Sequence, residues 1–228
     1  MKIAIMGAMS EEIAPILEML GEYKTIEYAQ NRYYTAQYKE HDLIIAYSKI
    51  GKVFSTLTAA TMIEKFGAEI LLFSGVAGGI NPNLKIGDLI VATALCQHDL
   101  DITAFGHPHG YVPEGKQFIE AEKQLIALAS EVAVEMGVKL QEGIIATGDQ
   151  FIHSEERKRW IQKTFKADAL EMEGTSVAVV CEALDVPFII LRAISDTADM
   201  DASFNFDAFL ESSAQESAQF IMKMVEKI

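Results

Sequence analysis

The chain has 228 residues, and half of them are hydrophobic. It contains 19 lysines and arginines and 33 aspartates and glutamates, which gives a formal net charge of −14. A surface this acidic repels phosphate polymers and anionic lipids, which argues against nucleic-acid and membrane partners but not against an uncharged nucleoside. Cys96 and Cys181 lie far apart in apolar sequence, which predicts buried free thiols in a reducing cytoplasm. No linker or change of composition divides the sequence, so we expect one domain over residues 1–228.

The first twenty residues predict a strand followed by a helix. Residues 2–6 form an apolar strand that ends at Gly7, and an amphipathic helix begins at Ser10. Glu12 lies in the first turn of this helix, where the helix dipole alone would favour an acid. Alternatively, it is a carboxylate at the carboxyl edge of the strand, where ligands bind in α/β sheets. A dinucleotide-binding loop is excluded, because such a loop needs the glycine pattern G-x-G-x-x-G and only Gly7 is present here.

Strands and helices alternate along the rest of the chain. The sequence predicts two antiparallel strands within 31–48, further strands at 70–73, within 85–93, at 143–147 and at 188–191, and helices at 55–66, 118–136, 154–165, 175–184 and 206–228. This alternation predicts an α/β fold with a mixed sheet.

Polar residues follow the apolar strand at 188–191 abruptly. Arg192, Ser195 and Asp196 come next in the sequence. An aspartate at the end of a strand, beside a serine that can orient it and near an arginine, suits proton transfer. A helix N-cap would explain the same serine and aspartate, since both residue types favour that position.

The segment ALEMEG at 169–174 contains a pair of acids before an apolar helix. In a strand, Glu171 and Glu173 would point to one side and Met172 to the other. The helix dipole accounts for Glu173 alone and not for both acids. A carboxylate can accept hydrogen bonds from two vicinal ribose hydroxyls, which is a functional explanation for the pair.

A glycine loop is expected after the strand at 70–73. Its glycines, Gly75, Gly78 and Gly79, would let the backbone approach a ligand closely. A tight turn into the next strand explains them equally well.

Two aromatic residues are candidates for ligand contact. Phe151 follows the strand at 143–147 and could stack on a planar ring, or be an ordinary core residue. Phe105 lies in a long polar segment, 97–115, which we interpret as a lid or a subunit contact that brings Phe105 to a ligand. The His-Pro-His sequence there lacks a third ligand at helical spacing, so we predict no metal site.

Six segments, in this order along the chain, carry a resemblance to a known family: MKIAIMGAMSEE, SGVAGG, HDLDITAFG, TGDQFI, ALEMEG and RAISDTAD. Together they resemble the 5′-methylthioadenosine/S-adenosylhomocysteine nucleosidases of the nucleoside phosphorylase superfamily. The resemblance spans nearly the whole chain. It implies a three-layer α/β/α fold, with a mixed twisted sheet partly closed into a barrel, a homodimer and no cofactor.

The resemblance also implies an activity, which is hydrolysis of the N-glycosidic bond of 5′-substituted adenine nucleosides. The substrates would be 5′-methylthioadenosine, S-adenosylhomocysteine and 5′-deoxyadenosine, with release of adenine and the free sugar. This reaction belongs to methionine salvage and S-adenosylmethionine recycling. Some relatives also cleave 6-amino-6-deoxyfutalosine, an intermediate of menaquinone synthesis, and the resemblance leaves that substrate open.

Roles for individual residues follow from the same resemblance. Glu12 would activate the attacking water, and Asp196 would protonate N7 of the leaving adenine. Glu173 would hold the ribose hydroxyls, with Met172 against the sugar. Phe151 would stack on adenine, the backbone of Ile152 would bond the edge of the base, and the backbone of Gly78 would line the site. Ser195 and Arg192 would support Asp196 and the acidic pair. The 5′ substituent would be surrounded by Met9, Phe105 and Phe206. Pro113 and the region of His107 would come from the partner subunit, and Val76 and His107 depart from the pattern of many relatives.

The residue types suit this chemistry. Glycoside cleavage passes through an oxocarbenium-like state, which acids near the ribose stabilise, and adenine must take up a proton as it leaves. The sister phosphorylases need arginine or lysine to hold phosphate. The N-terminal loop here offers Ser10, Glu11 and Glu12, which would repel phosphate, so we predict a hydrolase. A phosphate-dependent purine nucleoside phosphorylase of the same fold and a non-catalytic nucleoside sensor are the alternatives.

Overall fold

The computed structural model describes residues 1–196 and 206–228, without the side chains of 206–208. The predicted contact of Phe206 with the 5′ substituent therefore lies outside the described residues. The strands are β1 (Lys2–Gly7), β2 (Lys24–Tyr28), β3 (Asn31–Tyr38), β4 (His41–Tyr47), β5 (Ile70–Gly79), β6 (Leu89–Gln97), β7 (Ile119–Glu120), β8 (Leu140–Thr147), β9 (Ala169–Glu171) and β10 (Phe188–Asp196). The helices are α1 (Ser10–Leu20), α2 (Lys52–Glu64), α3 (Lys123–Met136), α4 (Glu155–Phe165), α5 (Gly174–Ala183) and α6 (Phe206–Val225), with a short 3₁₀ helix, η1, at Thr103–Phe105.

The strands form one mixed sheet that is partly closed. β5 lies at its centre and pairs in parallel with β1 on one side and with β10 on the other. From β10 the pairing continues through β6, β8 and β9 and returns to β5, so these strands close into a barrel. On the open side, β1 is followed by β4, β3 and β2. The predicted mixed sheet with a barrel is confirmed.

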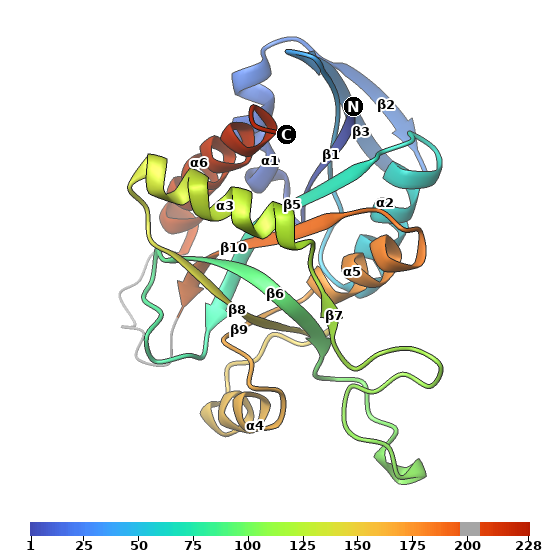
Figure 1. The fold of residues 1–228 in the computed structure, drawn as a ribbon, viewed down its shortest axis with the longest axis vertical. Coiled ribbons are helices and arrows are strands. Elements are labelled where there is room, and N and C mark those ends of the chain that lie inside the picture. The colour runs from blue at the N-terminus through green and yellow to red at the C-terminus, as the bar shows by residue number, and fades with distance from the viewer. Residues whose placement is uncertain (197–205) are drawn as a thin grey trace.

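Helices cover both faces of this sheet. α1 and α3 pack against α6 on one side, and α2 packs against α5 on the other (Figure 1). The core between them contains apolar residues of both the helices and the strands. The strand residues Ile5 in β1, Leu72 in β5 and Ile190 in β10 have no exposed surface. Strands buried on both faces read as continuous apolar runs, which is why β1 and β10 were recognisable in the sequence.

Two local predictions were wrong, and the strand β2 was missed. β2 was not predicted, because it has only five residues and all of them are exposed, so it lacks the buried apolar run by which the other strands were found. Gly75, Gly78 and Gly79 belong to β5 and not to a loop. The strand at ALEMEG ends at Glu171, and Glu173 is the residue before α5 with φ −136° and ψ −36°, so the two acids do not share a strand face.

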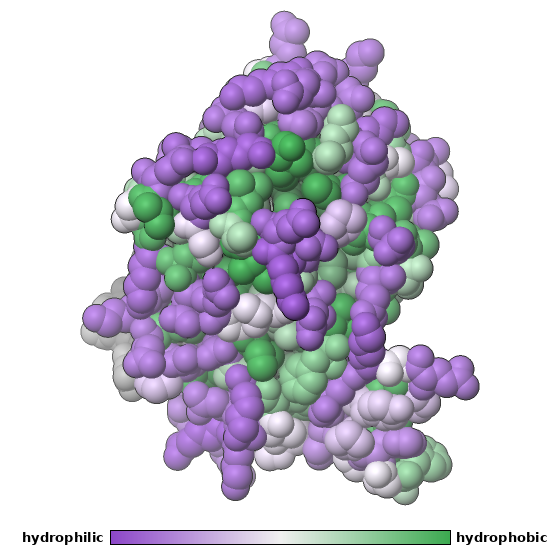
Figure 2. Space-filling model, in the orientation of Figure 1, coloured by the Kyte–Doolittle hydropathy of each residue, from purple (hydrophilic) through white to green (hydrophobic). Residues whose placement is uncertain are grey.

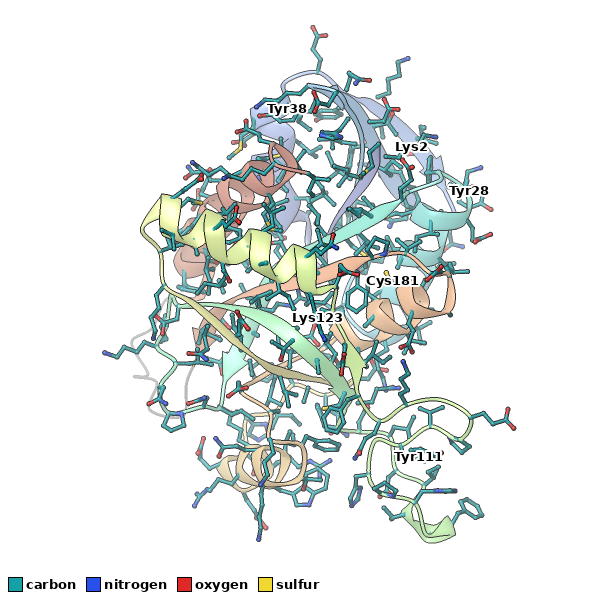
Figure 3. All side chains as sticks on the ribbon, in the orientation of Figure 1. Lys2, Tyr28, Tyr38, Tyr111, Lys123 and Cys181 are labelled. Atoms are coloured by element: carbon teal, nitrogen blue, oxygen red, sulfur yellow. The ribbon has the colours of Figure 1, made fainter. Side chains whose placement is uncertain are left out.

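The surface in view in Figure 2 is largely hydrophilic. Hydrophilic side chains cover most of the face in Figure 2, with apolar areas between them. The segment between β6 and β7 is irregular apart from η1, as predicted, and it projects from the body of the molecule with Tyr111 (Figure 3). None of the described helices could cross a membrane. Within residues 1–196 and 206–228, no group of histidine, cysteine and acidic side chains could hold a metal ion.

Candidate active site

Glu12 is buried at the point where β1 leads into α1. Its Oε2 accepts hydrogen bonds from the backbone N–H groups of Ala8 (2.6 Å) and Met9 (3.0 Å), and its Oε1 accepts one from Val76 (3.2 Å). Burial raises the pKa of Glu12, while Arg192 and the three N–H groups lower it by less. A carboxyl with a raised pKa is a stronger base, so this group can accept a proton from water.

β5 leaves room for the carboxylate of Glu12 because the strand residue beside it, Gly75, has no side chain. A Cβ on Gly75 would lie 2.9 Å from Oε1 of Glu12 and 3.3 Å from Nη1 of Arg192. The carboxylate of Glu12 and the guanidinium of Arg192 therefore both lie beside Gly75. Glycine in a strand often marks such a close approach, and this explains why the predicted glycine loop is strand instead.

Arg192 and Glu171 form a buried ion pair at the core of the site. Nη2 of Arg192 lies 2.8 Å from Oε2 of Glu171, and the guanidinium stacks 4.0 Å from the centre of the Phe73 ring. The same Oε2 accepts hydrogen bonds from the backbone N–H of Glu173 (3.1 Å) and Gly174 (2.7 Å). Glu171 thus anchors the turn that carries Glu173.

Glu173 is buried and close to other charges. Its Oε1 accepts a hydrogen bond of 2.8 Å from the backbone N–H of Gly51. Burial raises its pKa to about 7, and the neighbouring charge of Glu171 adds to the rise. Gly51 has φ +100°, and a Cβ there would lie 3.0 Å from Oδ1 of Asp149, so glycine is needed to present this N–H.

Asp196 lies at the carboxyl end of β10, over Gly78 of β5. A Cβ on Gly78 would be 3.1 Å from Oδ2 and 3.2 Å from Oδ1 of Asp196. The hydroxyl of Ser195 donates a hydrogen bond of 2.9 Å to Oδ1. The Asp196 side chain is 17% exposed, more open than the carboxylates of Glu12 or Glu171, and it can reach a ligand.

The remaining predicted contact residues surround these acids to different degrees. Met9 and Met172 are partly buried beside Glu12 and Glu173 in the sequence. Phe151 is 74% exposed and Phe105 81% exposed, so neither packs into the core. The interpretation of Phe151 as an ordinary core residue is therefore wrong. Ile152 is partly buried against a small apolar cluster that includes Phe165.

The sequence reasoning missed two contributors to the site. One is Gly51, whose N–H holds Glu173 from 122 positions away in the chain. The other is Lys158 in α4, whose Nζ lies 3.7 Å from Oδ2 of Asp196. Both contacts join distant segments, and no local pattern around either residue signals them.

Comparison with known proteins identifies the family. The model of the Phosphorylase superfamily matches residues 2–226. This chain belongs to that superfamily. Its similarity to the members described below covers 98–100% of their length.

Two curated members of the superfamily are informative. The chain is 61% identical over 228 residues to an aminodeoxyfutalosine nucleosidase of Campylobacter jejuni, covering 100% of both chains. It is 36% identical over 227 residues to a 5′-methylthioadenosine/S-adenosylhomocysteine nucleosidase of Staphylococcus aureus, covering 99% of this chain and 100% of the relative. Both are nucleosidases by name, and this chain is an N-glycosyl hydrolase like them.

Solved structures of the superfamily agree. The crystal structure of a Campylobacter jejuni 5′-methylthioadenosine/S-adenosylhomocysteine nucleosidase superposes with a TM-score of 0.98 at 61% identity, covering 100% of both chains. A futalosine hydrolase of Helicobacter pylori superposes with a TM-score of 0.96 at 54% identity, covering 100% of this chain and 98% of the other.

Proposed function

We propose that this enzyme hydrolyses the N-glycosidic bond of 5′-substituted adenine nucleosides and releases the base and a free sugar. Its substrates are 5′-methylthioadenosine, S-adenosylhomocysteine, 5′-deoxyadenosine and 6-amino-6-deoxyfutalosine. The 61% identity to an aminodeoxyfutalosine nucleosidase supports the last of these as a substrate. The 61% identity to a Campylobacter jejuni structure named as a 5′-methylthioadenosine/S-adenosylhomocysteine nucleosidase supports the first two. The enzyme then serves menaquinone synthesis as well as methionine salvage.

One observation carries the choice of water over phosphate. Backbone N–H groups at a helix N-terminus or a glycine-rich turn are the usual anion sites of a fold. Here the N–H groups of Ala8, Met9 and Val76 all donate to the carboxylate of Glu12. A phosphate would have to displace this buried carboxylate and lie beside its negative charge. A water molecule faces no such repulsion and can give a proton to Glu12.

The other groups divide the reaction between them. Glu173 accepts hydrogen bonds from the ribose hydroxyls, with Met172 against the sugar. Asp196, oriented by Ser195, gives its proton to N7 of the base as the glycosidic bond breaks. The sugar becomes an oxocarbenium-like cation, which the buried carboxylates stabilise. Glu12 takes a proton from the water that adds to C1′.

Binding uses further residues around these acids. Phe151 stacks on the base, and the backbone of Ile152 and Gly78 lines it. Arg192 holds Glu171, and through it the turn before Glu173. Met9, Phe105 and Phe206 line the pocket for the 5′ substituent. No cofactor or metal takes part.

We also propose that the enzyme acts as a homodimer of single-domain subunits in the cytoplasm. An apolar patch on α2 and α5, formed by Val53, Phe54, Leu57 and Val179, is exposed, and Val53 is 75% exposed. Such patches mark protein interfaces when several residues are contiguous. Phe105, on the irregular segment between β6 and β7, is 81% exposed and would line the 5′-substituent pocket of the partner subunit in this dimer. The buried free cysteines fit a reducing compartment.

The test is release of adenine from methylthioadenosine in phosphate-free buffer. Adenine and free methylthioribose at a rate unchanged by added phosphate are expected. Product that forms only with phosphate, as a sugar 1-phosphate, would instead establish a phosphorylase. Tight binding without product would leave a nucleoside sensor. The variant Asp196→Asn should bind the nucleoside and lose turnover, and near-normal turnover would refute its role.

A further inference from the structure

Lys158 is a lysine buried next to the proposed catalytic acid. It lies in the first half of α4 and is only 7% exposed, which is rare for lysine unless its charge is paired. Its Nζ lies 3.7 Å from Oδ2 of Asp196 and 3.9 Å from Oε1 of Glu155 on the same helix. Both distances exceed that of a direct hydrogen bond, so the ammonium acts here through its charge.

The two oxygens of Asp196 have different neighbours. Oδ1 accepts the hydrogen bond of the Ser195 hydroxyl, whereas Oδ2 faces the ammonium of Lys158. On the side of β5, a Cβ added to Gly78 would lie 3.1 Å from Oδ2, so the strand backbone contacts the carboxylate there. The carboxylate is therefore fixed by β5 below it, Ser195 on one side and Lys158 on the other.

We propose that Lys158 is a positioning residue for Asp196. The ammonium of Lys158 holds the Asp196 carboxylate towards the base and stabilises the negative charge left on that carboxylate after proton transfer. This inference rests on the proposed function. In that reaction the O–H bond of Asp196 breaks as an N–H bond forms at N7 of the base. The electron pair of the O–H bond stays on Asp196, and the pair of the glycosidic bond moves into the base. A negative charge thus appears on Asp196 next to the ammonium.

The position of α4 supports this assignment. The helix follows directly on Phe151 and Ile152, which are proposed to contact the base, so Lys158 stands on the base side of the site and not at the ribose. Glu155, its other neighbour, has a side chain that is 46% exposed, so water screens that pair more than the pair with Asp196. A purely structural lysine would not need to face the one proposed acid of the reaction.

The test is a double-mutant cycle on adenine release from methylthioadenosine, with Lys158→Met, Asp196→Asn and the combined variant. Lys158→Met should lower kcat about 10-fold with little change in KM, a size typical of coupled charged neighbours. Lys158→Arg should restore most of the activity. In the Asp196→Asn background, Lys158→Met should change kcat less than about twofold, because residues that act as a unit are not additive. Lys163→Met, on an exposed part of α4, is the matched control.

The outcomes separate this inference from the function on which it rests. If Lys158→Met costs the same factor with and without Asp196, or if Lys158→Arg rescues nothing, Lys158 does not act through the acid and the proposal fails. If Asp196→Asn keeps full activity, the proposed role of Asp196 as the acid fails, and the role of Lys158 fails with it. If the wild-type enzyme releases no adenine, the proposed function itself fails, whatever Lys158 does. Should Lys158→Met not fold, Lys158→Gln, which keeps a polar end, provides the same cycle.

Discussion

Glu173 should cost the free enzyme stability at neutral pH, and Glu173→Gln should recover it. The side chain is buried, and its carboxyl lies close to Glu171. Glutamine keeps the size of the side chain and an oxygen that can accept the hydrogen bond from Gly51, but it carries no charge. The substitution therefore isolates the cost of the charge.

The size of the effect follows from the pKa. Glu173 has a pKa of about 7 in the fold, against an ordinary value of 4.5. Since tenfold in proton affinity corresponds to about 1.4 kcal/mol, ionising Glu173 in the fold costs about 3 kcal/mol more than ionising it in the unfolded chain. The pKa of Glu173 is raised on folding, so ionisation of this group destabilises the fold. This destabilisation is absent below pH 4.5 and grows as the pH rises to 7.

Urea unfolding of both proteins at pH 4.5, 6 and 8 measures this difference. Glu173→Gln should have nearly wild-type stability at pH 4.5 and exceed it by about 3 kcal/mol at pH 8. Glu18→Gln, at an exposed position of α1, is the matched control and should show no such trend. A difference between Glu173→Gln and wild type that does not change with pH would refute the assignment of a raised pKa to this carboxyl.

Further predictions concern the neighbouring groups. Glu12→Gln should lower kcat for adenine release by about 10²- to 10⁴-fold with a smaller change in KM, and steady-state kinetics on methylthioadenosine would show whether it does. Gly78→Ala should slow turnover by displacing Asp196, since the added Cβ would lie 3.1 Å from Oδ2; an unchanged kcat would contradict this geometry. Arg192→Met should lower the free energy of unfolding by about 3–5 kcal/mol, because Glu171 would remain as a buried unpaired charge. Denaturant titration tests it, and a loss under about 1 kcal/mol would show that Glu171 is not held as an ion in the fold.

The parts of the site that could be predicted are those with a local signal. β1 and β10 are buried on both faces and therefore have continuous apolar sequences, and the polar residues that follow them mark the edge of the sheet. Glu12 and Asp196 could be selected on this basis. The paired acids of ALEMEG were also visible, although the turn before α5 separates Glu173 from the strand face of Glu171.

The parts that could not be predicted depend on contacts between distant segments. Gly75 and Gly78 looked like a loop because glycine weakens a strand. β5 continues through both because it pairs there with β10, and at Gly78 also with β9. The carboxylates of Glu12 and Asp196 occupy the space that side chains at these positions would fill. The pairing of Lys158 with Asp196 joins α4 to β10 across 38 positions. In the sequence Lys158 is one of several charged residues in a helix of low hydrophobicity, which predicts only a solvated face.

The buried charges of this site relate its stability to its chemistry. Burial raises the pKa of both Glu12 and Glu173, so the free enzyme holds carboxylates in surroundings that disfavour their charge. A neutral nucleoside does not stabilise these buried negative charges, whereas the positively charged, oxocarbenium-like sugar of the transition state does. Interactions that strengthen only in the transition state raise kcat, and those that are equal in the substrate complex do not. The stability that Glu173→Gln is expected to regain should therefore be accompanied by a loss of kcat greater than any change in substrate affinity.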